Sequence, residues 1–273
     1  MLQHSPLGKK SEYDVTYNPQ LLFPISRKTK RDEIGVPEPL PFYGVDLWHH
    51  YEVSWLNEKG KPVCAIAEIS YPCESPNIIE SKSMKLYFNS LNQTAFKNEF
   101  VLQEIITQDL SERVGAKVVV LLYPLQKNQS HQNMLARLPG IYLDELDIDC
   151  HVYQPDRALL KVEKDKVEET LSSDLLKSNC LVTGQPDWGS VQIQYRGQKI
   201  NHESVLRYIV SFRNHNEFHE QCIERIFMDI QKACQPELLT VYGRYTRRGG
   251  LDINPFRTTE KDVLPNNDRL IRQ

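Results

Sequence analysis

Alternating hydrophobic and polar positions in the first half of the chain predict a β-hairpin. Residues 46–55 and 63–71 are rich in Trp, Tyr, Val and Ile, and the Asn-Glu-Lys-Gly-Lys segment at 57–61 is typical of a turn. Hydrophobic residues at helical spacing follow and predict helices over 82–96 and 100–113. The first half therefore begins with two strands and continues with two helices.

Two further strands are expected in the middle of the chain, and the second half then repeats the whole order. The first spans 118–123, and the second, at 141–153, is less regular because of its acidic residues. The second half is predicted to hold strands 167–176 and 191–196, helices 204–213 and 219–232, and strands 238–245 and 251–256.

The order β-β-α-α-β-β thus occurs twice, and a short sequence echo supports a duplication. A Tyr-x-x-Ser-apolar segment begins at Tyr87 in one half and at Tyr208 in the other. Strand runs separated by helix pairs favour an α+β fold with antiparallel sheets, and no Rossmann or P-loop motif is present. We expect a lead-in at 1–40 and two repeated units at 41–155 and 156–273.

The composition is that of a folded globular protein. Of 273 residues, 40% are hydrophobic and 25% are charged. The chain has no apolar run long enough to span a membrane and no apolar signal core near its N-terminus, so we expect a cytoplasmic location. The net charge of −3 gives no electrostatic reason to expect binding to nucleic acids or anionic membranes.

Six cysteines show neither C-x-x-C pairs nor zinc-ligand spacing, so we expect free thiols and no metal site. Cys180 differs from the others because it follows a predicted strand and shares a loop with Asp187. A cysteine nucleophile needs a lowered pKa or a nearby base, and an aspartic acid could transfer a proton at the same place. Alternatively, Cys180 is a buried core thiol and Asp187 caps a turn.

A second cluster stands where the last two predicted helices meet. His219 and Glu220 lie in the first turns of the second of these helices, which Asn216 could cap. A glutamate there could accept two hydrogen bonds from a guanine-like ring. The cluster could equally be a hydrophilic helix start without a ligand.

Two more clusters suit a phosphate-bearing cofactor. Ser81 could cap the helix 82–96, and Lys82 and Lys85 share one face of it. Arg248 and Gly249 belong to an arginine-glycine turn whose positive charge matches phosphate oxygens. The bland alternatives are a solvated helix start and a solvated hairpin tip.

Taken together, these motifs resemble the long-form NADPH-dependent 7-cyano-7-deazaguanine reductases, the nitrile reductases of queuosine biosynthesis. The resemblance runs from about residue 8 to the end of the chain. The segments that carry it are E-S-K-S-M-K-L-Y at 80–87, S-N-C at 178–180 with Q-P-D-W-G at 185–189, F-H-E-Q-C at 218–222 and Y-T-R-R-G-G-L-D-I-N-P at 245–255.

The resemblance implies two tunnelling-fold units of the β-β-α-α-β-β type and a homodimer. It implies that Cys180 attacks the nitrile carbon to form a covalent thioimide, that Asp187 protonates the nitrogen, and that two NADPH molecules deliver two hydrides. The product would be 7-aminomethyl-7-deazaguanine. The residues implied to hold the ring are Ile79, Glu80, Ser81, His219 and Glu220, and those implied to hold NADPH are Ser81, Lys82, Arg248 and Gly249.

Other classes of function remain open from the residues themselves. A thiol nitrilase or amidase would form the same thioimide but would use water in place of hydride. A non-enzymatic binder of guanine-like ligands would leave Cys180 as a structural thiol. A pterin or GTP enzyme of the same fold would need a zinc site, which the sequence lacks.

Overall fold

The computed structural model describes residues 16–125 and 136–273, and the chain forms two compact units. Unit 1 comprises Met1–Lys30, Asp46–Asn133 and Arg247–Ile253, and unit 2 comprises Arg31–Val45, Met134–Thr246 and Asn254–Gln273. Three elements have residues in both units, namely α1 (Arg27–Ile34), β2 (Tyr43–Leu56) and β10 (Leu251–Thr258). The division into consecutive segments at 1–40, 41–155 and 156–273 stays a prediction.

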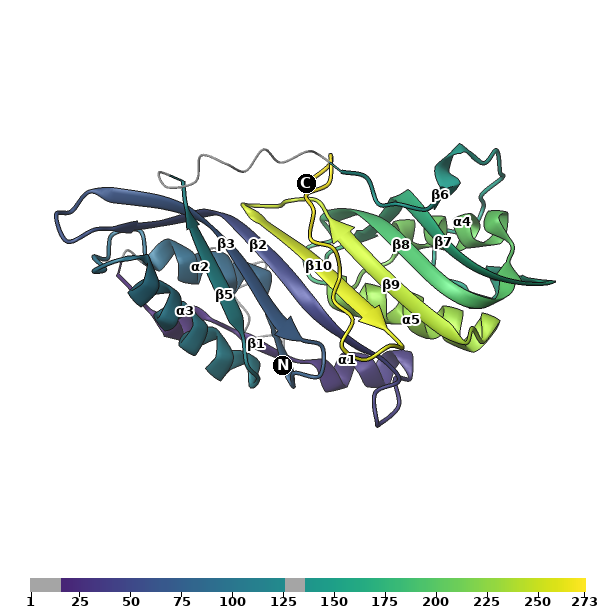
Figure 1. Cartoon of the computed structure of the whole chain (residues 1–273), viewed down its shortest axis with the longest axis horizontal. Coiled ribbons are helices and arrows are strands. Elements are labelled where there is room, and N and C mark those ends of the chain that lie inside the picture. Colours follow the sequence, from purple (N-terminus) through teal and green to yellow (C-terminus); the bar gives the residue numbers. More distant parts are fainter. Residues whose placement is uncertain (1–15, 126–135) are drawn as a thin grey trace. The chain divides into compact units, whose positions relative to one another are not determined.

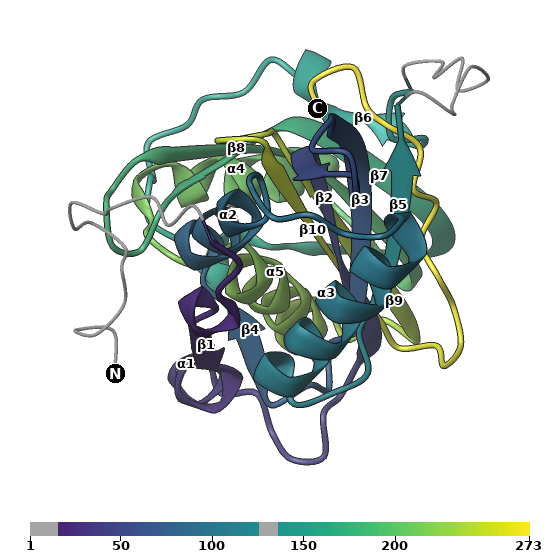
Figure 2. The same ribbon diagram turned by 90° about the vertical axis from the view of Figure 1, so that its left-hand side faces the viewer.

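Unit 1 packs two helices against neighbouring strands. Strands β5 (Val119–Pro124), β3 (Pro62–Pro72) and β2 follow one another in that order, and β3 and β5 are antiparallel. Helices α2 (Ser81–Ser90) and α3 (Glu99–Val114) lie on one face of these strands (Figure 1, Figure 2). The core between helices and strands includes Trp48, Trp55, Tyr71, Tyr87, Leu102 and Ile106. Two short strands, β1 (Pro24–Ser26) and β4 (Asn77–Ile79), form a separate antiparallel pair.

Unit 2 has the same layered plan. Its strands follow the order β10, β9 (Leu238–Tyr245), β8 (Pro186–Ile200), β7 (Val162–Asn179) and β6 (Ile141–Tyr142), all antiparallel except the β6–β7 pair. Helices α4 (His202–Ser211) and α5 (His219–Cys234) cover one face (Figure 1). Gly243 on β9 lets α5 approach closely, because a Cβ there would lie 2.5 Å from Ile223 Cδ1.

The structure confirms an α+β fold with antiparallel sheets, in keeping with the expected tunnelling-fold units. The two halves also share a hydrogen-bond pattern at the sequence echo. Tyr87 donates to Asp109 Oδ2 at 2.6 Å, and Tyr208 donates to Asp229 Oδ2 at 2.8 Å. In both helices the serine three residues later donates to the carbonyl of that tyrosine. The echo therefore marks equivalent positions in α2 and α4.

The strand predicted at 141–153 is wrong beyond Ile141–Tyr142. A 3-10 turn at Leu143–Glu145 follows it, and the chain then continues without strand structure. The carboxylate of Asp144 instead accepts hydrogen bonds from Ser173 Oγ at 2.5 Å and Asp174 N at 2.8 Å. Asp144 thus bonds to β7 from the side, and only Ile141–Tyr142 of the expected segment forms a strand.

The helix predicted at 82–96 ends earlier, at Ser90, because the next residues form tight turns. Leu91 N–H donates to Phe88 O at 3.2 Å, and Thr94 N–H donates to Leu91 O at 3.0 Å.

Across the residues that the structure describes, none of the helices is both long and apolar enough to cross a membrane.

Candidate active site

The loop that carries Cys180 is closed by its own backbone. Cys180 follows β7 directly, and its N–H donates to Gln185 O at 2.8 Å, while Gly184 N–H donates to Cys180 O at 3.0 Å. Gly184 has a φ of +66°, which glycine adopts without strain. The tight turn expected from the sequence therefore forms, and it returns the chain into β8.

This turn places Asp187 on β8 beside the end of β7. The register pairs Ser178 with Asp187, and the exposed fractions of Cys180 and Asp187 are only 6% and 5%. Both groups are thus held where little water reaches them. Such burial suits a covalent step, because it protects a reactive intermediate from hydrolysis.

The start of α5 is tied to the same turn. Asn179 N–H donates to His215 O at 2.8 Å, and Glu217 N–H donates to Asn179 O at 3.0 Å. These two bonds fix the segment that leads into the helix. As a result, His219 Nε2 lies 3.7 Å from Asp187 Oδ1.

Glu220 follows in the first turn of α5 and is 3% exposed. The positive end of the helix dipole favours a carboxylate at this position. The glutamate before the helix, Glu217, is held by Arg225, whose Nε donates to it at 2.8 Å. The structure therefore brings the second predicted cluster to the Cys180 turn, and Glu217 and Arg225 are supporting residues that sequence reasoning missed.

The buried side chain of Tyr245 packs against His219. Its ring packs edge-on against His219, with 4.2 Å between the ring centroids. It also explains Gly189, because a Cβ there would lie 3.1 Å from Tyr245 Cδ1. Burial raises the pKa of the Tyr245 phenol well above its usual value. The contact between Tyr245 and His219 joins the end of β9 to the start of α5, so no spacing in the sequence predicts it.

Burial is also the main reason that the pKa of Cys222 is raised to about 12. Cys222 is therefore a neutral thiol near pH 7 and lacks the thiolate that a nucleophile needs. Its place in the F-H-E-Q-C motif is structural. This leaves Cys180 as the candidate nucleophile of the cluster.

The start of α2 in unit 1 carries the other predicted contacts. Ile79 ends β4, and Glu80 is the N-cap of α2, with Oε1 accepting from Lys82 N at 2.7 Å and Oε2 from Ser83 N at 2.8 Å. The expectation that Ser81 caps the helix is therefore wrong, because the longer carboxylate reaches both N–H groups. Burial raises the pKa of Glu80, while these two donors and the nearby lysines oppose that shift.

The arginine-glycine turn lies against α2 in the same unit. Arg248 N–H donates to Leu251 O at 2.9 Å, and Gly249 has a φ of +59°. A Cβ at Gly249 would lie 3.0 Å from Lys85 Nζ, so the ammonium group stands directly at the turn. Lys82 lies one helical turn before Lys85. The cations at this turn make it a candidate site for cofactor phosphates, although Glu52 also stands beside Gly250.

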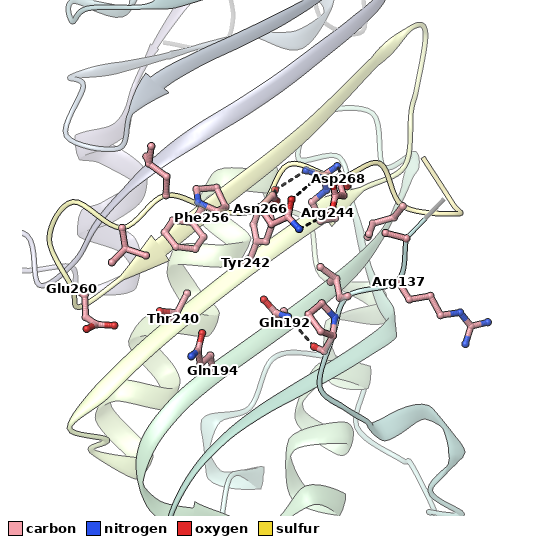
Figure 3. Close-up of a pocket in the computed structure, with 17 residues that line it drawn as sticks. Arg137, Gln192, Gln194, Thr240, Tyr242, Arg244, Phe256, Glu260, Asn266 and Asp268 are labelled. Carbon is pink, nitrogen blue, oxygen red and sulfur yellow. Dashed lines mark hydrogen bonds between the residues drawn. The ribbon is translucent and has the colours of Figure 1, made fainter. Parts of the chain in front are cut away.

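The described residues form no metal site, and they form a cavity that is separate from the predicted site residues. Within 16–125 and 136–273, no group of three or more His, Cys, Asp or Glu side chains could hold a metal ion. A cavity of about 290 Å³ in unit 2 is lined by Gln192, Thr240, Tyr242 and the C-terminal segment (Figure 3). None of the predicted site residues lines this cavity.

Comparison with known proteins points to one family. A family model described as nitrile reductase, 7-cyano-7-deazaguanine-reductase N-term, matches residues 13–122, and one described as QueF-like protein matches residues 186–263. A protein of Legionella pneumophila (strain Lens), named NADPH-dependent 7-cyano-7-deazaguanine reductase, is 62% identical over 98% of this chain and 95% of its own. Proteins of the same name from Ralstonia nicotianae and Cupriavidus taiwanensis are 58% and 56% identical over 99% of both chains.

A solved structure, that of the archaeosine synthase QueF-Like in the apo form, was also found. It aligns with a TM-score of 0.30 at 15% identity, over 35% of this chain and 94% of that chain.

Proposed function

The chain belongs to the family of NADPH-dependent 7-cyano-7-deazaguanine reductases, and we propose that it reduces the nitrile of 7-cyano-7-deazaguanine to the primary amine with NADPH. The product, 7-aminomethyl-7-deazaguanine, makes this a step of queuosine biosynthesis. One observation carries the chemical part of the proposal. Cys180 and Asp187 lie at one buried turn, and His219 stands 3.7 Å from the aspartate.

Cys180 captures the nitrile in the first step. Its sulfur attacks the nitrile carbon, so that a carbon–sulfur bond forms as one π bond between carbon and nitrogen breaks. Asp187 gives a proton to the nitrogen, which becomes basic in this step, and the hydrogen of the thiol replaces that proton. The sum is addition of the thiol across the nitrile, which yields a thioimide and restores Asp187.

The family is named for NADPH, and this cofactor, when bound, supplies the hydrides that reduce the captured carbon. The chain's own part is to hold it and to keep water away. We propose that Ser81, Lys82, Arg248 and Gly249 contact the cofactor, because the arginine-glycine turn lies beside the lysines of α2 and their positive charge matches phosphate oxygens. Two hydrides are needed to reach the amine.

Ring recognition falls to a second group of side chains. We assign contact with the N–H edge of the deazaguanine to the buried carboxylate of Glu220, since a carboxylate accepts hydrogen bonds from such donors, and His219 is the neighbouring residue. In unit 1, Ile79, Glu80 and Ser81 are further proposed contacts. Both oxygens of Glu80 already accept backbone N–H groups, and each retains a lone pair for a ring donor.

A homodimer in the cytoplasm, without direct contact to nucleic acid, belongs to the same proposal. The family resemblance supports the homodimer and the location, and the net charge of −3 gives no attraction to nucleic acid.

A product and stoichiometry assay tests the proposed function. Purified protein is incubated with 7-cyano-7-deazaguanine and NADPH, and both NADPH oxidation and the product are quantified. The proposal predicts two NADPH oxidised for each amine formed. A thiol nitrilase or amidase would instead give an amide or an acid without NADPH oxidation, and a non-enzymatic binder would leave the nitrile intact.

A further inference from the structure

Arg247 of unit 1 is held on an aromatic platform beside the arginine-glycine turn. Its guanidinium carbon lies 4.4 Å from the centroid of the Tyr51 ring. The Tyr51 hydroxyl donates to Asp252 Oδ2 at 2.8 Å, and the other oxygen of Asp252 lies 2.6 Å from His49 Nδ1. Asp252 is 1% exposed. The ring under Arg247 is therefore fixed by a buried hydrogen-bonded pair.

The same stack is joined to the turn through the backbone. Tyr51 N–H donates to Gly250 O at 2.9 Å. The side chain of Lys85 lies next to Gly249. The side chain of Glu52 lies next to Gly250, because a Cβ added at Gly250 would be 2.5 Å from the carboxyl carbon of Glu52. Arg247 itself is exposed. The turn thus presents an accessible guanidinium in a fixed place, with Lys85 as a second cation and with Glu52 and Asp252 as the nearby acids.

We propose that Arg247, stacked on Tyr51, binds the ribose 2′-phosphate by which NADPH differs from NADH. This inference rests on the proposed function. A phosphate monoester carries more than one negative charge near pH 7, and its oxygens match the planar guanidinium fork. An arginine near the ribose is a general solution for accepting this group. Stacking pre-organises the side chain, so less freedom is lost when the phosphate binds.

Two nucleotides that differ only in this phosphate give the most direct test. Binding of 2′,5′-ADP and of 5′-AMP is measured by calorimetry for the wild type, Arg247→Ala and Tyr51→Leu. Arg247→Ala is expected to weaken binding of 2′,5′-ADP by roughly 10-fold or more, since a charge-assisted hydrogen bond is lost, and to leave 5′-AMP unchanged. Tyr51→Leu keeps the arginine but removes its platform, so a smaller loss confined to 2′,5′-ADP is expected.

Arg113→Ala is the matched control, because Arg113 lies in the last turn of α3 in the same unit and bonds to Gln20. It should bind both nucleotides as the wild type does. In turnover assays, Arg247→Ala should raise KM for NADPH by about the same factor and leave kcat/KM for NADH unchanged. Equal losses for both nucleotides, or an unchanged affinity for 2′,5′-ADP, would overturn the assignment.

Covalent capture of the nitrile without cofactor separates this inference from the proposed function. Arg247→Ala should still capture 7-cyano-7-deazaguanine, which shows that the variant is folded. If the alanine variant loses capture, Arg247→Lys replaces it, since lysine keeps the charge but lacks the fork, and a loss confined to 2′,5′-ADP is again expected. A wild type that neither captures the nitrile nor oxidises NADPH contradicts the proposed function itself.

Discussion

The Nε2 atom of His219 lies 3.7 Å from the Oδ1 atom of Asp187. This distance is longer than a hydrogen bond, yet it places an imidazole directly beside the carboxyl group at the Cys180 turn. A protonated imidazole there would stabilise the aspartate that remains after proton transfer. The contact joins β8 to the first residue of α5 and so connects two motifs that are separate in the sequence.

Asp187→Asn tests whether this carboxyl group supplies the proton. Asparagine keeps the shape of the side chain but cannot protonate the nitrogen, so kcat should fall by about 10²- to 10⁴-fold. The dissociation constant of the substrate should change little. Single-turnover kinetics and equilibrium binding measure the two effects separately. Asp165→Asn, which alters an exposed acid of β7, should leave both unchanged. A fall in kcat of less than tenfold in Asp187→Asn argues against this role.

Glu220→Gln should chiefly weaken substrate binding. The amide retains one acceptor and loses the charge, so the affinity for 7-cyano-7-deazaguanine should drop by about 10- to 100-fold. Glu203→Gln is a close control, because Glu203 occupies the first turn of α4 as Glu220 does in α5, and it forms an exposed pair with Arg207. Calorimetry on both variants decides the point. Equal affinities for the two variants would remove Glu220 from the site.

The sequence predicted the elements whose apolar residues face one core. The strand expected at 238–245 coincides with β9 because its apolar residues, such as Leu239, Val241 and Tyr245, are buried in the core. The strand prediction for 141–153 failed beyond Tyr142, where Asp144 bonds to β7 in a contact that local periodicity does not reveal. The Cys180 turn was foreseen from Thr-Gly-Gln-Pro composition. Contacts such as Tyr245 with His219 and Tyr51 with Asp252 were missed, because each joins residues distant in the sequence.

His50 should make unit 1 sensitive to acid. Burial is the main cause that lowers its pKa from 6.5 to about 4, while the hydrogen bond to the Gly250 carbonyl opposes this shift and the charge of Lys85 contributes to it. Between these values the unfolded chain binds a proton that the folded chain does not, so stability is full above pH 6.5 and falls as the pH drops towards 4. By pH 5 the loss should be about 2 kcal/mol.

Urea unfolding at pH 7 and pH 5 checks this prediction. Fluorescence of the buried Trp48 and Trp55 reports on unit 1. His50→Asn removes the titrating ring, so it should lose about 2 kcal/mol less than the wild type between the two pH values. The same acid-induced loss in both proteins would show that other groups are responsible.

Gln273→Ala should destabilise unit 2 through Arg244. Arg244 is 2% exposed, and its Nε and Nη2 atoms donate to Gln273 Oε1 at 2.9 and 2.6 Å (Figure 3 shows Arg244 at the cavity). Removing this acceptor leaves buried guanidinium N–H groups with fewer bonds, which costs about 2–3 kcal/mol. Urea unfolding followed by circular dichroism should show the loss. Gln198→Ala, at an exposed position of β8, should have almost no effect, and similar losses in the two variants would contradict the prediction.

Covalent capture by Cys180 is the central claim, and intact-mass spectrometry tests it most directly. The wild type is mixed with 7-cyano-7-deazaguanine in the absence of NADPH, and peptide mapping locates any adduct. We expect an added mass of one substrate on Cys180, none in Cys180→Ala, and an unchanged adduct in Cys64→Ala, which removes an exposed thiol. A wild type without an adduct, or a Cys180→Ala variant that still forms one, would contradict the account.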